Sequence, residues 1–378
     1  MVTVLIAPDK FKGSLRASEV VDSLARGLAT RGISSHGLPL ADGGDGSVEA
    51  AVHAGFRPVE ISVTGPTGKP HQAVIAVDGA TAVIEVANTC GLSVLPGGER
   101  APLQASSRGV GEAMVAALDR GSTRLVLALG GSASTDGGAG MLAALGVVFR
   151  DRNGSTIDDV NGGSLPQISS VDRSGLIDLS QVEIIVASDV ENVLTGLRGA
   201  ASVYGPQKGA TPAQVQYLDA GLTNLVHHLA AAGWGEATQV AEARGAGSAG
   251  GLGFAGILLG GRLVSGASFF LDLLEFDTQA RGCHLVITGE GKLDSQTLAG
   301  KLIAIVARRS GNMPVIAVVG RSEVRESERQ ELGIEAVHAL SELTDEDCAG
   351  NPALSAQLLE ELGRRMPLPT PRRPSVAV

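Results

Sequence analysis

The sequence of 378 residues has few aromatic residues, few cysteines and no excess of basic residues. Its ten aromatic residues and net charge of −10 argue against a surface that stacks bases and against a general nucleic-acid binder. The three cysteines lie far apart, so neither a disulfide framework nor a metal-binding cysteine spacing is indicated. There is no uncharged apolar run of about 18 residues and no basic, apolar leader. We therefore expect a cytoplasmic protein with no signal peptide and no membrane span.

Glycine, in contrast, is abundant, with 52 residues or about twice the usual share. Much of it falls in four clusters, at residues 43–46, 130–140, 245–253 and 289–291, and acids accompany all but the third. Glycine-rich loops that join a strand to a helix let backbone N–H groups converge on phosphate. Carboxylates in such loops hold Mg²⁺, which bridges phosphate oxygens. The combination favours an enzyme that uses a nucleotide.

Short Val/Ile/Leu runs alternate with amphipathic Ala/Leu stretches at both ends of the chain, as in the expected strand 2–7 and the expected helix 17–30. The pattern predicts an α/β fold with two domains. A Rossmann-like domain with a parallel sheet is expected from both chain ends, residues 1–60 plus 240–366. Residues 61–239 are expected to form an inserted second α/β domain, and residues 367–378 a disordered tail.

One segment, Gly245–Gly250, matches the dinucleotide motif GxGxxG, with Asp272 about 20 residues further on. The preceding ATQVAEAR is not a convincing strand, so an ordinary loop before a helix is favoured. A nicotinamide-dependent oxidoreductase stays an alternative. No Walker A motif is present, because no Gly-Lys pair is followed by Ser or Thr.

Six motifs occur in a fixed order between residues 7 and 301: APDKFKGSL, PLADGGDGS, GGSASTDGGAGM, SDVENVLTGLRGAASVYGPQKGA, RGAGSAGGLG and TGEGKLDSQTLAGK. Together they resemble the bacterial type-1 glycerate kinases over nearly the whole chain. Five positions depart from the family pattern, namely Lys10 for Ser, Asp45 for Glu, Thr135 for Asn, Ser188 for Cys and Val193 for Pro. Of these, Lys10 adds positive charge near Lys12.

The resemblance implies phosphorylation of D-glycerate by ATP with Mg²⁺, through in-line transfer in a cleft between domains. The 2-hydroxyl is the expected acceptor, giving 2-phosphoglycerate. Glycerate would be the small-molecule partner of a monomer or homodimer, without a nucleic-acid or membrane partner. A kinase that forms 3-phosphoglycerate, a kinase of another small hydroxy acid and a non-catalytic sensor with this fold stay as alternatives.

Phosphoryl transfer needs a proton acceptor, a cation and positive charge around the transferred group. We predict Asp189 as the general base or a metal ligand, Asp42 as a second carboxylate, and Lys12 and Lys208 as contacts of the glycerate carboxylate or phosphate. The residues predicted to bind ATP are Gly130, Gly131, Asp136, Gly137, Gly138, Glu290 and Lys301. The predicted metal ligands are Asp189, Glu290 and Asp294. Which acid is the base and which hold metal stays open at this point.

Overall fold

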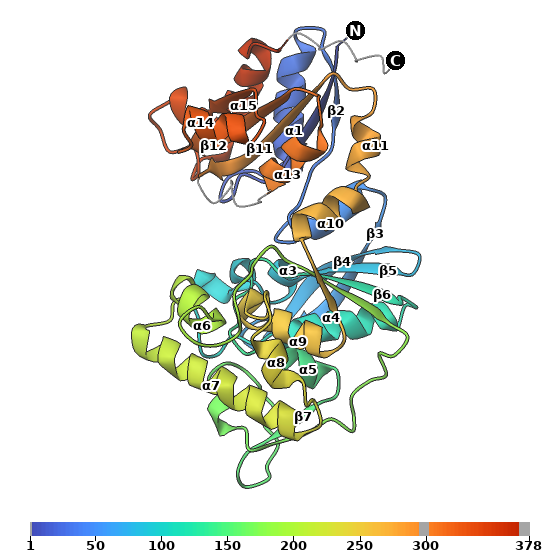
Figure 1. The fold of residues 1–378 in the computed structure, drawn as a ribbon, viewed down its shortest axis with the longest axis vertical. Helices are drawn as coiled ribbons and strands as arrows, with labels where there is room; N and C mark the ends of the chain where they lie inside the picture. Colours follow the sequence, from blue (N-terminus) through green and yellow to red (C-terminus); the bar gives the residue numbers. More distant parts are fainter. Residues whose placement is uncertain (1, 295–301, 370–378) are drawn as a thin grey trace. The chain divides into compact units, whose positions relative to one another are not determined.

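The computed structural model describes residues 2–294 and 302–369, and the chain divides into two compact units. Unit 1 comprises Met1–Asp42 and Ala267–Val378, and unit 2 is the continuous stretch Gly43–Gly266 (Figure 1). These boundaries differ from the predicted ones near residues 60 and 240. The reason is that β3 (Arg57–Thr64) pairs with β4 (Pro70–Asp78) and β10 (Arg262–Val264) pairs with β9 (Glu183–Ala187), so that they form the two opposite edges of the sheet in unit 2. In the tail predicted at 367–378, residues 370–378 lie outside the described residues.

Unit 1 contains a five-stranded sheet whose described strand pairs are all parallel, in the order β13–β12–β11–β1–β2. Its strands are β1 (Thr3–Pro8), β2 (Ser34–Gly37), β11 (Leu285–Leu293), β12 (Val315–Ser322) and β13 (Ala336–Ala339). Val4, Leu5 and Ile6 of β1 are fully buried. Such a continuous apolar run is typical of a parallel strand that is covered on both faces. The α/β class predicted from the chain ends is confirmed.

The described helices associated with unit 1 are α1 (Ala17–Ala29), α10 (Gly266–Leu273), α11 (Phe276–Ala280), α13 (Leu302–Arg309), α14 (Glu326–Glu331) and α15 (Pro352–Arg365). Leu24 and Leu28 of α1 and Leu359 of α15 join one core with Val4 and Ile6 of β1. Helix α15 begins at Asn351, whose side chain accepts from the N–H of Leu354, and Pro352 takes the first helical position. Unit 1 is thus closed by a helix from each end of the chain.

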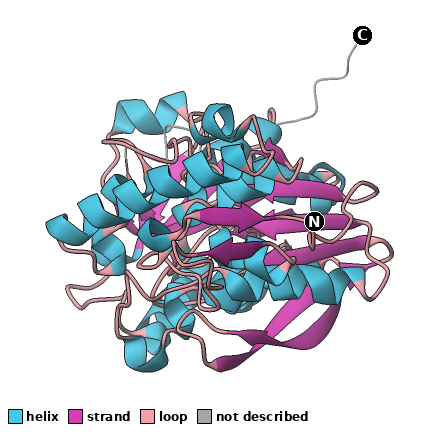
Figure 2. Ribbon diagram, turned by 90° about the horizontal axis from the view of Figure 1, so that it is seen from below, coloured by secondary structure: helices cyan, strands magenta, loops and turns pink. Residues whose placement is uncertain are grey.

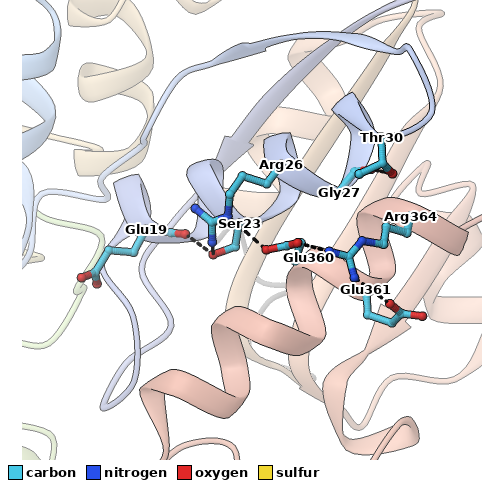
Figure 3. A network of polar contacts seen from close by, with 8 residues as sticks. All are labelled: Glu19, Ser23, Arg26, Gly27, Thr30, Glu360, Glu361 and Arg364. Carbon is cyan, nitrogen blue, oxygen red and sulfur yellow. Dashed lines mark hydrogen bonds and ion pairs between the residues drawn. The ribbon is translucent and has the colours of Figure 1, made fainter.

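Helices α1 and α15 approach each other closely at two glycines. A Cβ atom on Gly27 would lie 2.1 Å from the carbonyl oxygen of Glu360, and one on Gly363 would lie 2.9 Å from the Cα of Gly27. Beside the crossing, Arg26 Nε donates to the Glu360 carboxylate at 3.0 Å, and Arg364 also pairs with Glu360 (Figure 3). Only residues without a side chain permit this approach of two helix backbones.

Unit 2 contains a six-stranded mixed sheet in the order β10–β9–β6–β5–β4–β3, in which the first four strands are parallel and the last two pair antiparallel. Its other strands are β4 (Pro70–Asp78), β5 (Thr81–Glu85), β6 (Arg124–Ala128) and β9 (Glu183–Ala187). A separate hairpin pairs β7 (Val148–Arg150) with β8 (Ser170–Asp172). Figure 2 shows the strands in magenta with the helices that cover them in cyan.

The described helices of unit 2 are α2 (Ser47–His53), α3 (Val86–Cys90), α4 (Arg108–Leu118), α5 (Ala139–Ala144), α6 (Ala200–Tyr204), α7 (Pro212–Ala231), α8 (Ala237–Ala241) and α9 (Leu252–Leu258). Met114 of α4, Leu222 of α7 and Phe254 of α9 are fully buried in one core with Leu127 of β6. Within the two described ranges, no helix is both long and apolar enough to cross a membrane.

Replacement of Gly27 by Ala tests the helix crossing. Alanine favours an isolated helix by about 1 kcal/mol over glycine. We nevertheless expect Gly27→Ala to lower the free energy of unfolding by about 1–3 kcal/mol, because the new Cβ would meet the Glu360 backbone. Urea unfolding followed by circular dichroism measures the change. Gly235→Ala is the control, since a Cβ there meets nothing within 4 Å. Equal or greater stability of Gly27→Ala would contradict the crossing.

Candidate active site

Two of the glycine clusters meet at the carboxyl ends of β6 and β9 in unit 2. The Gly130 N–H, just after β6, donates to the carbonyl of Gly43 at 3.1 Å. A Cβ on Gly130 would lie 2.4 Å from the Cα of Gly44, and one on Gly43 would lie 3.0 Å from the carbonyl oxygen of Ala187, the last residue of β9. The loops around Gly43 and Gly130 therefore touch backbone to backbone.

The cluster at 245–253 joins this arrangement from a distant part of the sequence. The Gly137 N–H donates to the carbonyl of Gly250 at 2.9 Å. A Cβ on Gly250 would lie 2.0 Å from the carbonyl oxygen of Ser134, and one on Gly251 would lie 2.5 Å from the Cα of Gly137. Three of the four glycine clusters thus converge, and close approach between backbones is one reason for their composition.

The GxGxxG match lies inside this third cluster, and its surroundings are not those of a dinucleotide site. The motif at Gly245–Gly250 follows the helix α8 and runs into the short 3₁₀ turn Ser248–Gly250 before α9. The dinucleotide fingerprint requires a strand before the glycines and a helix directly after them. The oxidoreductase alternative therefore loses the structural setting on which it depended.

Asp136 is fully buried and links the starts of two helices. Its carboxylate accepts four hydrogen bonds, from the N–H and the hydroxyl of Ser107 at 2.8 and 2.7 Å, and from the N–H groups of Gly138 and Gly140 at 3.1 and 3.2 Å. Ser107 precedes α4, and the two glycines lie at the start of α5. Burial raises the pKa of Asp136, and the four hydrogen bonds oppose that effect. In this structure Asp136 binds the starts of α4 and α5, and none of its surface is exposed to a ligand such as ATP.

Lys208 is buried beside the same loop, with only 3% of its surface exposed. Its Nζ donates to the hydroxyl of Ser132 at 2.8 Å and to the carbonyl of Ser134 at 2.5 Å. Burial lowers the pKa of Lys208 to about 8, while the nearby Asp136 carboxylate acts in the opposite direction. The ammonium group therefore secures residues 132–134, and its predicted contact with substrate stays a prediction.

The predicted phosphate-binding amides are largely engaged inside the protein. As described above, the N–H groups of Gly130, Gly137 and Gly138 donate to Gly43, Gly250 and Asp136. Among the residues described, the N–H of Gly131 has no such acceptor, and Gly131 adopts a left-handed φ of 78°. Of the four, Gly131 is the amide that remains for a phosphate oxygen.

Asp189 lies just beyond the carboxyl end of β9 and is exposed. The preceding Ser188 anchors this turn, because its hydroxyl hydrogen-bonds to that of Ser248 at 2.7 Å and accepts from the N–H of Val190 at 3.2 Å. An exposed carboxylate on a well-anchored turn at a strand end can meet a substrate, which suits the predicted role of Asp189.

A second group of charged residues lies in unit 1 at the carboxyl ends of β1 and β11. Asp9 directly follows β1, and its N–H donates to the carbonyl of Gly289 at 2.8 Å. Its carboxylate lies 3.7 Å from Nζ of Lys10. Burial raises the pKa of Asp9 to about 7; the Lys10 charge opposes this, whereas the charges of Asp42 and Glu290 raise it further. The charges of Asp42 and Glu290 therefore both act on the carboxyl group of Asp9.

Lys12 and Asp294 of unit 1 both lie near the end of β11. Lys12 is exposed in the turn after β1, and its backbone packs on β11, where a Cβ on Gly291 would lie 3.1 Å from the Lys12 nitrogen. Asp294 follows β11 and lies 3.6 Å from Nζ of Lys292. Lys301 lies outside the described residues.

The predicted metal ligands are divided between the two units. Glu290 and Asp294 belong to unit 1, whereas Asp189 belongs to unit 2. In residues 2–294 and 302–369, no group of three or more His, Cys, Asp or Glu side chains is arranged to hold a metal ion. The assignment of these three acids to a metal stays a prediction.

Two acids at strand ends, Glu85 and Asp9, were not predicted from the sequence. Glu85 ends the buried strand β5, is 3% exposed, and accepts from the N–H of Val48 at the start of α2 at 2.9 Å. Asp9 ends β1 in the same way. Both stand directly at the end of an apolar strand, and that position is the signal that could have identified them.

Replacement of Asp136 tests its structural role. Asparagine offers one acceptor oxygen to four donors, and its amide N–H groups face other donors. We expect Asp136→Asn to lower the free energy of unfolding by about 2–4 kcal/mol in urea titrations. The exposed acid Asp158 provides the control, since Asp158→Asn should change stability by less than about 0.5 kcal/mol. Equal effects of the two substitutions would refute the linking role.

Comparisons with known proteins agree with the motif order. A sequence profile of the glycerate kinase family matches residues 4–366. The chain is 42% identical to glycerate kinase of Bacillus subtilis over 346 residues, which cover 89% of this chain and 90% of the relative. It is 41% identical to glycerate 2-kinase of Escherichia coli K12 over 327 residues, covering 84% of each chain.

A solved structure extends the agreement to three dimensions. A crystal structure assigned to glycerate kinase 2 of Salmonella typhimurium LT2 superimposes with a TM-score of 0.76 at 38% identity, covering 95% of this chain and 97% of the other. The similarity therefore includes both units in sequence and in fold. The chain belongs to the glycerate kinase family, whose members are phosphotransferases.

Proposed function

We propose that this protein transfers the terminal phosphoryl group of ATP to D-glycerate in the presence of Mg²⁺. The proposed acceptor is the 2-hydroxyl, so that the product is 2-phosphoglycerate. The observation that carries the proposal is the family match over residues 4–366, which includes every predicted acid and lysine. The name glycerate 2-kinase of one relative supports the choice of hydroxyl.

In phosphoryl transfer the protein forms no covalent bond with the substrates in this proposal, and its main contribution is to position them. The glycerate hydroxyl attacks the terminal phosphorus of ATP, the bond to the bridging oxygen of ADP breaks, and the hydroxyl proton must leave. We assign the proton to the carboxylate of Asp189, which is exposed at the end of β9. Lys12 is assigned to the negative charge of the phosphates or of the glycerate carboxylate, because its side chain is exposed at the end of β1.

Mg²⁺ binds oxygen ligands and is usually held by one or two carboxylates together with substrate phosphates. The charges of Asp42 and Glu290 both raise the pKa of Asp9, so these two acids act on the same part of unit 1. We propose Glu290 as a ligand, with Asp42 and Asp294 as neighbouring acids. When bound, the cation neutralises phosphate charge.

Asp136 and Lys208 contribute by positioning in this proposal. They fix residues 132–140, which follow β6, through hydrogen bonds to Ser132, Ser134, Ser107 and the start of α5. A rigid loop at a strand end places the exposed N–H of Gly131 for a phosphate oxygen. The use of ATP fits a cytoplasmic location, and a monomer or homodimer stays our prediction for the assembly.

Release of ADP, measured with a coupled enzyme assay, tests the proposal. We expect ADP formation that depends on Mg²⁺ and on D-glycerate, with much slower turnover of L-glycerate and of related hydroxy acids. Enolase added alone consumes 2-phosphoglycerate, whereas 3-phosphoglycerate first needs a mutase. ADP formation that is the same with and without glycerate would refute the function, and a mutase requirement would reassign the hydroxyl.

Replacement of Asp189 tests the proton acceptor. We expect Asp189→Asn to lower kcat by about 10²–10⁴-fold with an unchanged melting temperature, because the amide cannot accept the hydroxyl proton. The matched control is Glu191→Gln, two residues further along the same turn, where an exposed carboxylate pairs with Arg244. The control should keep its turnover within about twofold. Near wild-type turnover of Asp189→Asn would exclude this residue as the base.

A further inference from the structure

Unit 1 contains a cavity of about 720 Å³ at the carboxyl ends of its parallel strands. Phe11, Lys12 and Ser14 line it from the segment after β1, and Lys292 and Arg321 line it from the ends of β11 and β12. Residues of the segment 341–349, between β13 and α15, complete its wall. All of the described residues that line it belong to unit 1.

The sheet topology marks this place as a ligand site. In the order β13–β12–β11–β1–β2, the chain passes from β1 to β2 in one direction along the sheet and from β11 through β12 to β13 in the other. The strand order therefore reverses between β1 and β11. In open α/β sheets, ligands bind outside the carboxyl ends of the strands at such a reversal. The segment after β1 and the carboxyl end of β11 both line the cavity.

The size of the cavity suits a nucleotide better than a three-carbon acid. Small-molecule sites usually enclose about 300–1,000 Å³. A volume of about 720 Å³ is within that range, and it is far more than glycerate would fill. Phe11, which is 3% exposed, and Gly320 give the wall an apolar part of the kind that packs against a flat base.

The cavity is lined by both cations and acids. The cations Lys12, Lys292 and Arg321 come from the ends of β1, β11 and β12. The acids Asp345, Glu346 and Asp347 come from the segment after β13, and a fourth acid, Glu323, follows β12. Lysine and arginine side chains bind phosphate, whereas carboxylates accept hydrogen bonds from ribose hydroxyls.

Two details of the lining leave polar groups for a ligand. Lys292 is paired with Glu323 at 2.9 Å, and Arg321 with the same acid at 3.6 Å. Lys12, in contrast, forms no ion pair within the described part of the chain. The hydroxyl oxygen of Ser14 is buried and has no hydrogen-bond partner among the described residues. A phosphate oxygen and a further polar ligand atom would satisfy these two groups.

We propose that this cavity binds the nucleoside diphosphate part of the phosphoryl donor, with its phosphates toward Lys12 and its ribose toward Asp345 and Asp347. The identity of the donor rests on the function proposed above. The inference assigns the nucleoside to unit 1, so that the converging glycine loops of unit 2 are left to the acceptor side of the reaction.

A substitution that fills the cavity provides the first test. Ala349 is exposed and lines the cavity. We expect Ala349→Trp to raise KM for ATP at least about tenfold, with KM for D-glycerate within about twofold of wild type. Ala353→Trp is the matched control, because Ala353 is an exposed alanine at the start of α15 that does not line the cavity. An unchanged KM for ATP in Ala349→Trp would overturn the proposal.

Protection of a cysteine provides the second test and does not depend on turnover. Cys348 lines the cavity, Cys283 lies elsewhere in unit 1, and Cys90 is fully buried. Burial raises the pKa of Cys348, so alkylation by N-ethylmaleimide is followed at mildly alkaline pH with mass spectrometry of the peptides. We expect ADP to slow alkylation of Cys348 at least about fivefold and to leave Cys283 unchanged, as for a site that is largely occupied.

The outcomes separate the two proposals. Protection by ADP in a protein that does not phosphorylate glycerate would keep the cavity assignment and refute the proposed function. Turnover of glycerate with no protection by ADP would refute the cavity assignment alone. Equal protection by inorganic pyrophosphate and by ADP would show that the cavity holds phosphates without the nucleoside, and would also overturn the proposal.

Discussion

The buried carboxylate of Asp136 is the point around which unit 2 is arranged. Its hydrogen bonds fix Ser107 and the first turn of α5, and this fixes the path of the loop after β6. That path brings Gly137 against Gly250 and puts the carbonyl of Ser134 within reach of Lys208. Moving a buried carboxylate away from several hydrogen-bond donors costs much free energy. The loops that contact Asp136 are therefore held in place.

Much of the fold could be predicted from local pattern. The strand expected at 2–7 and the helix expected at 17–30 correspond to β1 and α1, since a buried parallel strand and an amphipathic helix each have a strong sequence period. The domain boundaries could not be obtained in this way. They depend on β3 and β10 joining the sheet of unit 2 at its two edges, and the strand partner that each takes cannot be read from composition.

The candidate site was predictable in position more than in detail. Of the glycine clusters, the one at 130–140 was expected after a strand and follows β6, whereas the one at 245–253 follows helix α8. The acceptors of the glycine N–H groups were not predictable, because Gly250 and Gly43 are remote in sequence from the amides they bind. The burial of Lys208 was likewise not predictable from the sequence. Its surroundings in the sequence are those of a surface loop, and only the packed structure reveals that its charge is buried and already bound.

The crossing of α1 and α15 has a consequence for how the chain is made. Unit 1 needs β1 and α1 from the beginning of the chain and α15 from its end, whereas unit 2 is one continuous stretch. During synthesis, unit 2 can complete its core while the first 42 residues still lack their partners. Val20, Leu24 and Leu28 share their core with Leu359 and Leu362 of α15, so this core is complete only after α15 has been made. The order of synthesis thus makes unit 1 the last part to fold, and its N-terminal segment the part that most needs protection from aggregation.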